Sequence, residues 1–388
     1  IDGETEGAIV SWSDFIDRNS LSSEEALLDA QASVTPEDIC YILYTSGSTA
    51  TPKGVMLAHK GVIENGFDIG ERQHLTESDR LWLAVPLFWS FGSANALPAI
   101  MTHGGTIVLQ ESFEPEQAIS IIESEGCTVF YGMANMARAI KAHHRWSAKA
   151  VKSIRTGLTI GLPEDVAFIV EALGADELCN VYGSTETYGN ATVCDAFDPL
   201  EQRLHSQGLP LPGMTIKIFD RDSRESLPVG VVGEIAIKGY VMSGYYLEPD
   251  MTATAFHDGY FLSGDLGYLD EDGRLYFRGR FKEMIKTGGI NVAPLEVEGV
   301  LVKHSKIKQA YVVGIDDPIK EEKVVAVVVY EEGEQESEKD LRKFCRGELA
   351  SYKVPECIIA YQESNLPLTS TGKINKIKLK DELSMKVG

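Results

Sequence analysis

The feature that most constrains the fold of this chain is an alternation of strand-like and helix-like segments over residues 81–182. Alternation at these lengths is typical of parallel strands joined by helical crossovers, which cover a sheet with helices. The pattern therefore predicts an α/β fold with a mostly parallel, helix-covered sheet. The strand-like segments are Leu81–Val85, Thr106–Gln110, Cys127–Tyr131 and Glu177–Tyr182, and the helix-like segments are Pro115–Glu125, one ending near Lys141, and Pro163–Leu173.

Past residue 213 the pattern of the sequence changes. Short strand-like runs alternate with turns rich in Gly, Pro and Asp, at Thr215–Asp220, Val232–Lys238 and Arg274–Arg278. This spacing favours a small antiparallel or β-barrel-like part within the same large body. By contrast, residues 1–35 carry no strong signal for a helix or a strand.

A second change in composition, toward Lys and Glu, begins after Arg280. The segments that follow predict a small α+β module of ordinary domain size. We therefore expect a large body over residues 1–279 and a small C-terminal domain over residues 280–388, joined near residues 279–282. The predicted helices of the small module are Pro294–Val302 and Ser337–Leu349, and its predicted strands are Gln309–Ile315 and Val324–Tyr330.

The net charge of −22 over 388 residues argues against two classes of partner. So acidic a chain repels nucleic acid and anionic membrane surfaces, and no apolar run approaches the ~18 residues that span a bilayer. We expect neither a nucleic-acid partner nor a transmembrane segment. The six cysteines show no CxxC spacing and no ligand-spaced histidine, so we expect free thiols in a reducing, cytoplasmic compartment.

The strongest local motif is the loop Tyr44–Gly54, which follows the apolar run Ile39–Leu43. Its hydroxyls and backbone N–H groups can wrap phosphate oxygens, and Lys53 can offset their charge. The spacing is not that of a Walker A loop, and a flexible polar loop is the competing interpretation. The residues that carry the phosphate-binding hypothesis are Thr45, Ser46, Gly47, Ser48, Thr49 and Lys53.

A second motif, Asn180–Glu186, directly follows a predicted strand. At the carboxyl end of a parallel strand an aromatic ring can stack on a base, a hydroxyl can bond a phosphate oxygen and a carboxylate can hold Mg²⁺. Tyr182, Thr185 and Glu186 have these three chemistries. Taken alone, the motif is better explained by a strand-end turn with a solvated glutamate.

Three further motifs follow in order, at Gly259–Gly267, Gly279–Gly289 and Pro367–Ile374. In the first of them Asp265 suits a ribose diol, because one carboxylate can accept hydrogen bonds from two adjacent hydroxyls. Each motif by itself is compatible with a surface turn. Five motifs in this order along one chain are not explained in that way.

The ordered set resembles the adenylate-forming superfamily, which contains acyl-CoA synthetases, firefly luciferase and the adenylation domains of peptide synthetases. The resemblance covers about residues 36–380. It implies a two-step reaction, in which a carboxylate first attacks the α-phosphorus of ATP and gives acyl-adenylate and pyrophosphate. A thiol, that of CoA or of a carrier protein, then displaces AMP and gives a thioester.

The resemblance also implies a role for each motif residue. The Thr45–Lys53 loop would hold the β- and γ-phosphates of ATP. Lys373 would bridge the acid and the α-phosphate, where a positioned lysine stabilises the developing charge. Nucleotide contacts are implied for Tyr182, Gly183, Asp265 and Arg280, and catalytic roles at the α-phosphate and Mg²⁺ are implied for Thr185 and Glu186.

Members of this superfamily rotate the small domain about a residue that matches Lys282. One orientation would deliver Lys373, and the other would bring the Lys286–Gly289 segment to the site. There Gly288 and Gly289 would leave room for the slim pantetheine arm of CoA. Solvated surface lysines are the alternative interpretation of Lys282 and Lys286.

The stretch Phe88–Phe91 bears on the identity of the acid, because amino-acid-activating relatives hold the substrate amine with an Asp near this position. The aromatic residues here favour an apolar acid, whether fatty, alicyclic or aromatic. Core packing is the competing interpretation of Trp89. The acid-pocket residues that we expect are Trp89, Phe91 and Tyr188.

Together these inferences predict an ATP-dependent carboxylic acid–CoA ligase that uses Mg²⁺, with a small carboxylic acid, ATP and CoA as its partners. Three alternatives stay open: loading of an acyl carrier protein, a non-catalytic homologue and a luciferase-type oxidation. Two departures from the family pattern are Ala50 in place of the usual glycine and the short strand end Gly157–Pro163. They bear on the phosphate and adenine contacts respectively.

The start of the chain is the largest departure. Members of the superfamily carry a long N-terminal subdomain ahead of the phosphate loop, whereas here the loop begins at residue 45 and the first residue is Ile. We expect a chain that was processed, truncated or cut from something longer, with the N-terminal half either removed or present as a separate segment. The resemblance also leaves room for a homodimer.

Overall fold

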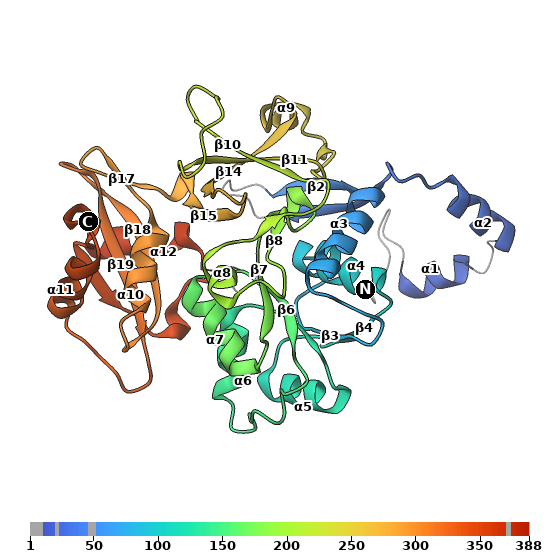
Figure 1. The fold of residues 1–388 in the computed structure, drawn as a ribbon, viewed down its shortest axis with the longest axis horizontal. Coiled ribbons are helices and arrows are strands. Elements are labelled where there is room, and N and C mark those ends of the chain that lie inside the picture. Colours follow the sequence, from blue (N-terminus) through green and yellow to red (C-terminus); the bar gives the residue numbers. More distant parts are fainter. Residues whose placement is uncertain (1–10, 20–22, 46–51, 370–373, 388) are drawn as a thin grey trace.

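The computed structural model describes residues 11–19, 23–45, 52–369 and 374–387 (Figure 1). Residues 46–51, which include Ser46, Gly47, Ser48 and Thr49, lie outside these ranges, as does the predicted catalytic Lys373. Their roles therefore stay predictions.

The centre of the large body is a sheet with the strand order β4-β3-β5-β6-β7-β8-β9. Strands β3 to β7 pair in parallel, and the short β8 and β9 add antiparallel pairs at one edge. The predicted mostly parallel sheet is therefore confirmed. The strands are β3 (Arg80–Leu83), β4 (Thr106–Leu109), β5 (Val129–Tyr131), β6 (Thr156–Thr159), β7 (Glu177–Tyr182), β8 (Thr192–Val193) and β9 (Leu209–Pro210).

Helices cover both faces of this sheet. They are α3 (His59–Arg72), the π-helical turn η1 (Phe91–Ala96), α4 (Leu97–Thr102), α5 (Pro115–Glu125), α6 (Ala134–Ala142), α7 (Pro163–Leu173) and α8 (Leu200–His205). Because successive strand side chains point to opposite faces, Trp82 and Phe130 pack with α5, α6 and α7. Their neighbours Leu81 and Tyr131 pack with α3, η1 and α4.

Helices α5 and α7 begin and end where the sequence predicts, because both carry local signals at their ends. Each has a proline at its first position, and each ends at a glycine in the left-handed conformation, Gly126 or Gly174. The side chain of Glu114 also caps α5, since it accepts hydrogen bonds from the N–H groups of Glu116 and Gln117.

The antiparallel part predicted after residue 213 is present, with the strand order β10-β11-β14-β13 and β15 paired to β14. Within the described residues the two outer strands of this order do not pair with each other. This part is therefore an open antiparallel sheet and not a closed barrel. A further small sheet has the order β1-β2-β12. The strands are β1 (Ile39–Thr45), β2 (Lys53–Ala58), β10 (Thr215–Phe219), β11 (Gly233–Lys238), β12 (Gly244–Tyr245), β13 (Phe256–His257), β14 (Tyr260–Leu269) and β15 (Leu275–Arg280), and α9 (Pro249–Thr254) lies between β12 and β13.

The C-terminal module, orange to red in Figure 1, has its own sheet with the order β17-β16-β19-β18 and β20 on β19. The module has two apolar cores, one on each face of this sheet, and alternate residues of β19 belong to different cores. Ala326 packs with α10 and α11, while Val325 and Val327 pack with α12. The predicted α+β module is confirmed, and its boundary near residues 279–282 stays a prediction. The elements are the 3₁₀ turn η3 (Phe281–Glu283), β16 (Ile285–Thr287), β17 (Ile290–Val292), α10 (Pro294–Val302), β18 (Ile307–Asp317), β19 (Glu321–Tyr330), α11 (Glu338–Glu348), β20 (Cys357–Ala360) and α12 (Lys376–Val387).

Two helices precede the first strand, where the sequence carried no strong signal. They are α1 (Trp12–Asn19) and α2 (Glu24–Ser33), which lie beside the body at the right of Figure 1. Helix α2 begins at the N-cap Ser23, whose hydroxyl accepts from the N–H of Ala26, and it has no buried residue. A helix held by capping rather than by an apolar face gives little periodicity to detect.

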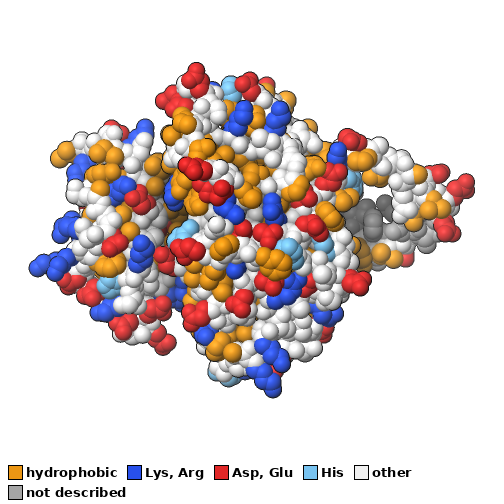
Figure 2. Space-filling model, in the orientation of Figure 1, with side chains coloured by type: hydrophobic (Ala, Val, Ile, Leu, Met, Phe, Trp, Pro, Cys, Tyr) orange, Lys and Arg blue, Asp and Glu red, His pale blue; other side chains and the backbone are white. Residues whose placement is uncertain are grey.

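No described helix is both long and apolar enough to cross a membrane. On the face shown in Figure 2, acidic and basic side chains are interspersed, with hydrophobic side chains between them. That face therefore offers no continuous basic patch of the kind that binds nucleic acid.

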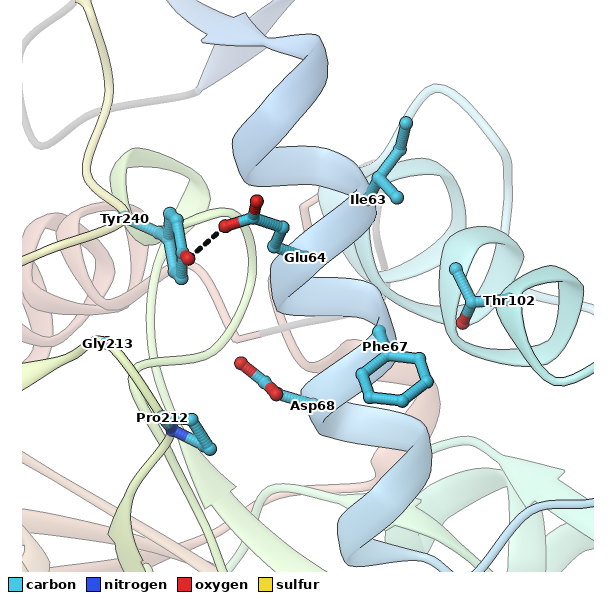
Figure 3. Close-up of a pocket in the computed structure, with 8 residues that line it drawn as sticks. All are labelled: Ile63, Glu64, Phe67, Asp68, Thr102, Pro212, Gly213 and Tyr240. Carbon is cyan, nitrogen blue, oxygen red and sulfur yellow. Dashed lines mark hydrogen bonds between the residues drawn. The ribbon is translucent and has the colours of Figure 1, made fainter. Parts of the chain in front are cut away.

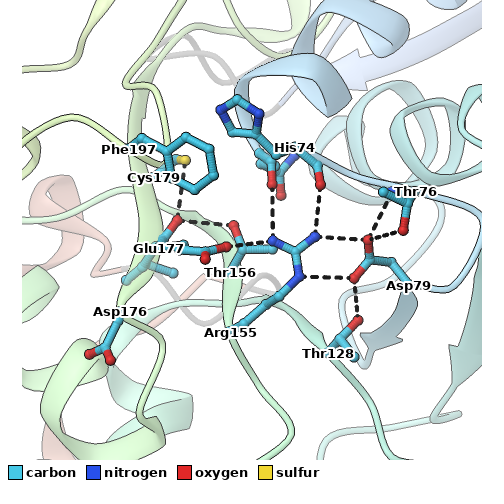
Figure 4. Close-up of polar contacts among 12 residues, drawn as sticks. His74, Thr76, Asp79, Thr128, Arg155, Thr156, Asp176, Glu177, Cys179 and Phe197 are labelled. Atoms are coloured by element: carbon cyan, nitrogen blue, oxygen red, sulfur yellow. Dashed lines mark hydrogen bonds and ion pairs between the residues drawn. The ribbon is translucent and has the colours of Figure 1, made fainter.

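An ion cluster ties together the amino-terminal ends of the central strands (Figure 4). Arg155 bonds Asp79 through Nη2 and Oδ2 at 2.8 Å and Glu177 through Nη1 and Oε2 at 2.5 Å. It also donates to the backbone carbonyl of His74 at 2.8 Å. Burial by itself would raise the pKa of Asp79, but hydrogen bonds from Arg155 and Thr128 hold that pKa below its usual value. This cluster lies at the amino-terminal ends of the strands, whereas the candidate site lies at their carboxyl ends.

Candidate active site

The predicted ribose-binding pair is brought together by strand pairing. Asp265 in β14 lies directly opposite Arg280 in β15, and Arg280 Nε is 3.3 Å from Asp265 Oδ1. Asp265 is only 6% exposed, whereas the Arg280 side chain is 60% exposed. The carboxylate is therefore fixed by its neighbours, and the guanidinium keeps a face toward solvent.

Tyr182 joins this pair from the end of the central sheet. Its hydroxyl donates a hydrogen bond of 2.9 Å to Asp265 Oδ2, and its ring lies 5.7 Å from that of Phe277 in β15. Two motifs that are 83 residues apart in the sequence thus meet at one carboxylate. Whether Tyr182 stacks on adenine stays a prediction.

Burial controls the protonation of this group. It raises the pKa of Asp265 to about 6, although the positive charge of Arg280 and the hydrogen bond from Tyr182 act in the opposite direction. The nearby carboxylates of Glu283 and Glu186 add to the rise. The pKa of the Tyr182 hydroxyl also rises, first through burial and then through the charge of Asp265. Tyr182 is therefore a hydrogen-bond donor at neutral pH.

A second group forms around Glu186, which lies in the short turn after β7. Tyr245 of β12 donates from its hydroxyl to Glu186 Oε1 at 3.0 Å. Lys53, which pairs with Thr45 across the β1–β2 hairpin, places its Nζ 5.0 Å above the ring of Tyr245. The base of the predicted phosphate loop therefore lies beside the predicted metal ligand.

The backbone around Glu186 explains its glycine and hydroxyl neighbours. At Gly183 a Cβ would lie 2.2 Å from the carbonyl oxygen of Gly189, so only glycine fits this approach of two chain segments. Ser184 and Thr187 form a reciprocal capping box at the turn. Thr185 donates from its hydroxyl to Ser90 Oγ at 3.1 Å. Ser90 connects this turn to the predicted acid pocket.

The predicted acid-pocket residues differ in their surroundings. Phe91 and Tyr188 are 4% and 3% exposed, and Tyr188 accepts a hydrogen bond on its hydroxyl from the N–H of Ala58. Trp89 is half-buried, with its ring 5.5 Å from that of Phe91. Of these three, Trp89 keeps the most surface for a ligand, and the pocket itself stays a prediction.

A separate pocket of about 460 Å³ lies between α3 and the loops that carry Gly213 and Tyr240 (Figure 3). Glu64 and Asp68 point into it, and the hydroxyl of Tyr240 bonds Glu64. None of the predicted site residues lines this pocket. Two carboxylates would repel a carboxylate substrate, so the pocket does not fit the acid. Its lining residues are Ile63, Glu64, Phe67, Asp68, Thr102, Pro212, Gly213 and Tyr240.

The predicted CoA and hinge residues lie in the C-terminal module. Lys282 is exposed in η3, and the N–H of Lys286 in β16 donates to Glu322 at 2.9 Å. Gly288 and Gly289 form the two-residue turn of the β16–β17 hairpin, with φ of 57° and 78°. Such a turn needs positive φ at both positions, so turn geometry already accounts for the glycines. The roles with CoA stay predictions.

Some residues of the site were not singled out by the sequence. Tyr245 and Ser90 both contact predicted catalytic residues, yet neither stands out in its local pattern. Tyr245 lies 59 residues from Glu186 and reaches it because β12 pairs with β2. No local signal marks that pairing.

Comparison with known proteins gives family-model matches to "AMP-binding enzyme" over residues 3–246 and to "AMP-binding enzyme C-terminal domain" over residues 296–373. The putative acyl-CoA synthetase YngI of Bacillus subtilis is 33% identical over 93% of this chain and 66% of its own length. The mitochondrial medium-chain acyl-CoA ligase ACSF2 of Mus musculus is 34% identical over 89% of this chain and 58% of its own length. Feruloyl-CoA synthase of Amycolatopsis is 34% identical over 88% of this chain and 69% of its own length. The chain thus spans between 58% and 66% of the length of the first two relatives.

Solved structures agree with this likeness. ATP-bound MatB from Rhodopseudomonas palustris aligns with a TM-score of 0.84 and 27% identity, over 94% of this chain and 73% of that chain. The apo form of the same protein aligns over the same shares with a TM-score of 0.74. The arrangement described here is therefore closer to the ATP-bound form of that neighbour.

Proposed function

The chain belongs to the AMP-binding enzyme family, and from that membership we propose that it is an ATP-dependent carboxylic acid–CoA ligase. Mg-ATP converts an apolar acid to acyl-AMP and pyrophosphate, and the thiol of CoA then displaces AMP to give acyl-CoA. The names of the relatives, which include medium-chain acyl-CoA and feruloyl-CoA enzymes, support a fatty or aromatic acid. They also favour CoA over a carrier protein as the acceptor.

The observation that carries this proposal is the meeting of two side-chain groups at the carboxyl end of β7. Tyr182, Asp265 and Arg280 form one group, and Lys53, Tyr245 and Glu186 form the other. The first supplies a fixed carboxylate for a ribose diol, and the second places a cation and a carboxylate where a polyphosphate and its metal would lie. A nucleoside triphosphate carries its ribose and its polyphosphate in this same order.

In each step one bond forms and one bond breaks at the atom under attack. In the first step a carboxylate oxygen of the acid bonds to the α-phosphorus, and the bond to the bridging oxygen of pyrophosphate breaks. In the second step the CoA thiol gives up its proton to water, its sulfur bonds to the acyl carbon, and the bond between that carbon and the phosphate oxygen of AMP breaks. The first step gathers negative charge around the α-phosphorus, so Thr185 and Lys373 would act there by electrostatic stabilisation.

Glu186 fits a Mg²⁺ ion that arrives with ATP. Within the described residues no cluster of three or more His, Cys, Asp or Glu side chains is able to hold a metal by itself. Mg²⁺ is commonly held by one or two carboxylates together with substrate phosphates and water. Tyr245 orients one oxygen of Glu186, and the carboxylate has a second oxygen for the ion. When bound, Mg²⁺ would neutralise charge on the phosphates.

We propose a cytoplasmic location, because all six cysteines lie in the described ranges and carry free thiols, as is usual in a reducing compartment. The name of the mouse relative places that enzyme in mitochondria. A homodimer and a separate N-terminal segment remain predictions from the resemblance.

The experiment that tests the function measures pyrophosphate release with ATP and Mg²⁺ across a panel of fatty, alicyclic and aromatic acids, with and without CoA. We expect turnover with an apolar acid, followed by acyl-CoA formation when CoA is present. Glu186→Gln serves as the control for the site. If no acid in the panel releases pyrophosphate above that control, the proposal is wrong. If pyrophosphate is released but only a carrier-protein thiol accepts the acyl group, the carrier-loading alternative replaces it.

The two half-reactions separate the predicted roles of the lysines. Lys373→Ala should abolish adenylation, with a loss of about 10²–10³-fold or more, yet leave thioester formation from supplied acyl-adenylate. Lys286→Ala should slow mainly the second step. Equal losses in both half-reactions for either variant would contradict its assigned role.

A further inference from the structure

Lys376, the first residue of α12, lies between two carboxylates from different elements. Its Nζ is 2.9 Å from Glu298 Oε1 in α10 and 3.1 Å from Glu283 Oε2 in η3. The Lys376 side chain is 18% exposed and that of Glu298 is 5% exposed. A cation buried to this degree is stable only with such partners.

The two partners have different roles. Glu298 also accepts a hydrogen bond of 2.8 Å from the backbone N–H of Val312, which fixes it to β18. Glu283 is 36% exposed and directly follows the predicted hinge residue Lys282. Lys376 therefore connects the inner framework of the small module to the hinge segment. We call Lys376, Glu283 and Glu298 the clasp.

The clasp fixes the base of a short chain segment that leads to α12. Leu368 and Ile374 form an antiparallel bridge, and the N–H of Asn375 donates to the carbonyl of Pro367 at 2.7 Å. The bridge thus closes the chain on both sides of residues 369–373. Lys373 lies outside the described residues, but it immediately precedes Ile374 in the sequence. The bridge at Ile374 and the ion pairs of Lys376 therefore fix the backbone that directly follows Lys373 in the sequence.

The clasp is also adjacent to the nucleotide group. The charge of Glu283 raises the pKa of both Asp265 and Arg280. In the clasp Lys376 offsets part of this charge, since the same cation also pairs with Glu298. Without Lys376, Glu283 would be free to compete with Asp265 for Arg280. This arrangement occurs in a chain whose overall geometry is closer to the ATP-bound than to the apo form of the structural neighbour MatB.

We propose that Lys376 is a positioning residue for the adenylation step, which with Glu283 and Glu298 holds the base of the Lys373 segment against the hinge beside Asp265 and Arg280. The inference rests on the proposed function and adds a residue that acts on it through others. A purely structural ion cluster is the competing explanation. It would stabilise the module equally in both steps of the reaction.

The test measures both half-reactions in the whole chain for Lys376→Met and for the conservative Lys376→Arg. We expect Lys376→Met to slow adenylation by about 10²-fold, because small misplacements of catalytic groups cost rates of that order. Thioester formation from supplied acyl-adenylate should stay within about twofold, since that step does not use Lys373. Lys376→Arg keeps the charge and should recover most of the adenylation rate.

Two further variants guard against misfolding and non-specific charge effects. Lys376→Met leaves the buried Glu298 unpaired, so Glu283→Gln is the milder variant, because it keeps the pair between Lys376 and Glu298. It should slow adenylation in the same selective way. Lys378→Met is the matched control, since Lys378 is an exposed lysine on the same helix. We expect it to match the parent chain in both half-reactions.

Hydrogen–deuterium exchange of residues 364–376 tests the clasp independently of catalysis. Lys376→Met and Glu283→Gln should speed exchange there by about tenfold, and Lys376→Arg and Lys378→Met should not. Unchanged exchange, or equal losses in both half-reactions, would overturn the positioning role. If the parent chain does not adenylate any acid but the exchange result is as expected, the clasp stands and the proposed function fails.

Discussion

Asp265 carries its charge where burial opposes it, and this sets how the site must respond to pH. For a carboxyl whose pKa rises from 3.8 in the unfolded chain to about 6 in the folded one, the folded state binds the proton more tightly. Its contribution to stability therefore falls as the pH rises through that window. A ribose diol needs the opposite form, since only the ionised carboxylate accepts from both hydroxyls.

We predict that nucleoside affinity rises with pH through about 6 and is constant above it. Adenosine is the probe, because its own groups do not titrate in this range. Its dissociation constant should be about tenfold larger at one pH unit below the pKa of Asp265 than at a pH well above that pKa. Calorimetric titration at several pH values measures this. Asp265→Asn should bind weakly and without this pH dependence, and a flat profile for the parent chain would contradict the assignment.

Tyr245 gives a second prediction, which concerns Mg²⁺. Removal of its hydroxyl in Tyr245→Phe deprives Glu186 Oε1 of its donor, so the carboxylate is less well oriented. Loss of such an outer partner typically lowers metal affinity by about 10–100-fold. The Mg²⁺ concentration for half-maximal pyrophosphate release should rise accordingly. Tyr246→Phe is the matched control, because Tyr246 is 42% exposed. Equal Mg²⁺ requirements in the two variants would refute the role of Tyr245.

The sequence predicts those site residues that lie within motifs and misses those that arrive from elsewhere. Asp265 and Arg280 were singled out because they lie in the motifs Gly259–Gly267 and Gly279–Gly289, and the pairing of β14 with β15 then joins them. Tyr245 was not, since its contact with Glu186 depends on the antiparallel pairing of β12 with β2. Lys376 has no distinguishing neighbours and gains its role from two distant carboxylates.

Among helices and strands, local end signals decided what could be predicted. Helices α5 and α7 have proline at their start and a left-handed glycine after their end, and their bounds match the sequence. Helix α2 lacks a buried face, and strands β8 and β9 are too short to show a period. Elements of that kind are defined by their partners, which no local pattern records.

The ends of the central strands depend on Arg155, and a substitution there should destabilise the large body. Arg155→Met would leave Asp79, whose side chain is 3% exposed, buried without its cation. We expect a loss of about 3 kcal/mol in the free energy of unfolding, measured by urea denaturation at pH 7. The parent chain should lose the contribution of Asp79 as the pH falls below 3.8 toward its lowered pKa.

A matched pair elsewhere gives the control for this prediction. Arg145 and Glu116 also form an ion pair, but their side chains are 42% and 52% exposed. Arg145→Met should therefore change stability by less than about 1 kcal/mol. The double variant Asp79→Asn with Arg155→Met should recover part of the loss, because it removes the buried charge. Similar effects of Arg155→Met and Arg145→Met would mean that the cluster contributes little.

In the whole chain, the apolar cores divide into two sets. The large clusters that pack the central and antiparallel sheets draw on residues 40–277, and those of the C-terminal module draw on residues 285–387. The segment between these sets contains η3 and Lys282. Arg221 of the large body contacts this segment, since its guanidinium carbon lies 3.4 Å from the centre of the Phe281 ring. Few shared core residues imply that each part is able to unfold without the other.

The last prediction tests this division by calorimetry of the whole chain. Ile140 and Leu301 are both fully buried, in α6 and α10 respectively. Replacing either with Ala leaves a cavity that typically costs 2–5 kcal/mol, about 10 °C or more for a small module. We expect two thermal transitions. Leu301→Ala should lower the midpoint temperature of only one of them, and Ile140→Ala should lower that of only the other. Ile377→Ala, at a position 61% exposed, should move neither. A single transition that shifts with both core variants would show one cooperative unit and remove the basis for a hinge near Lys282.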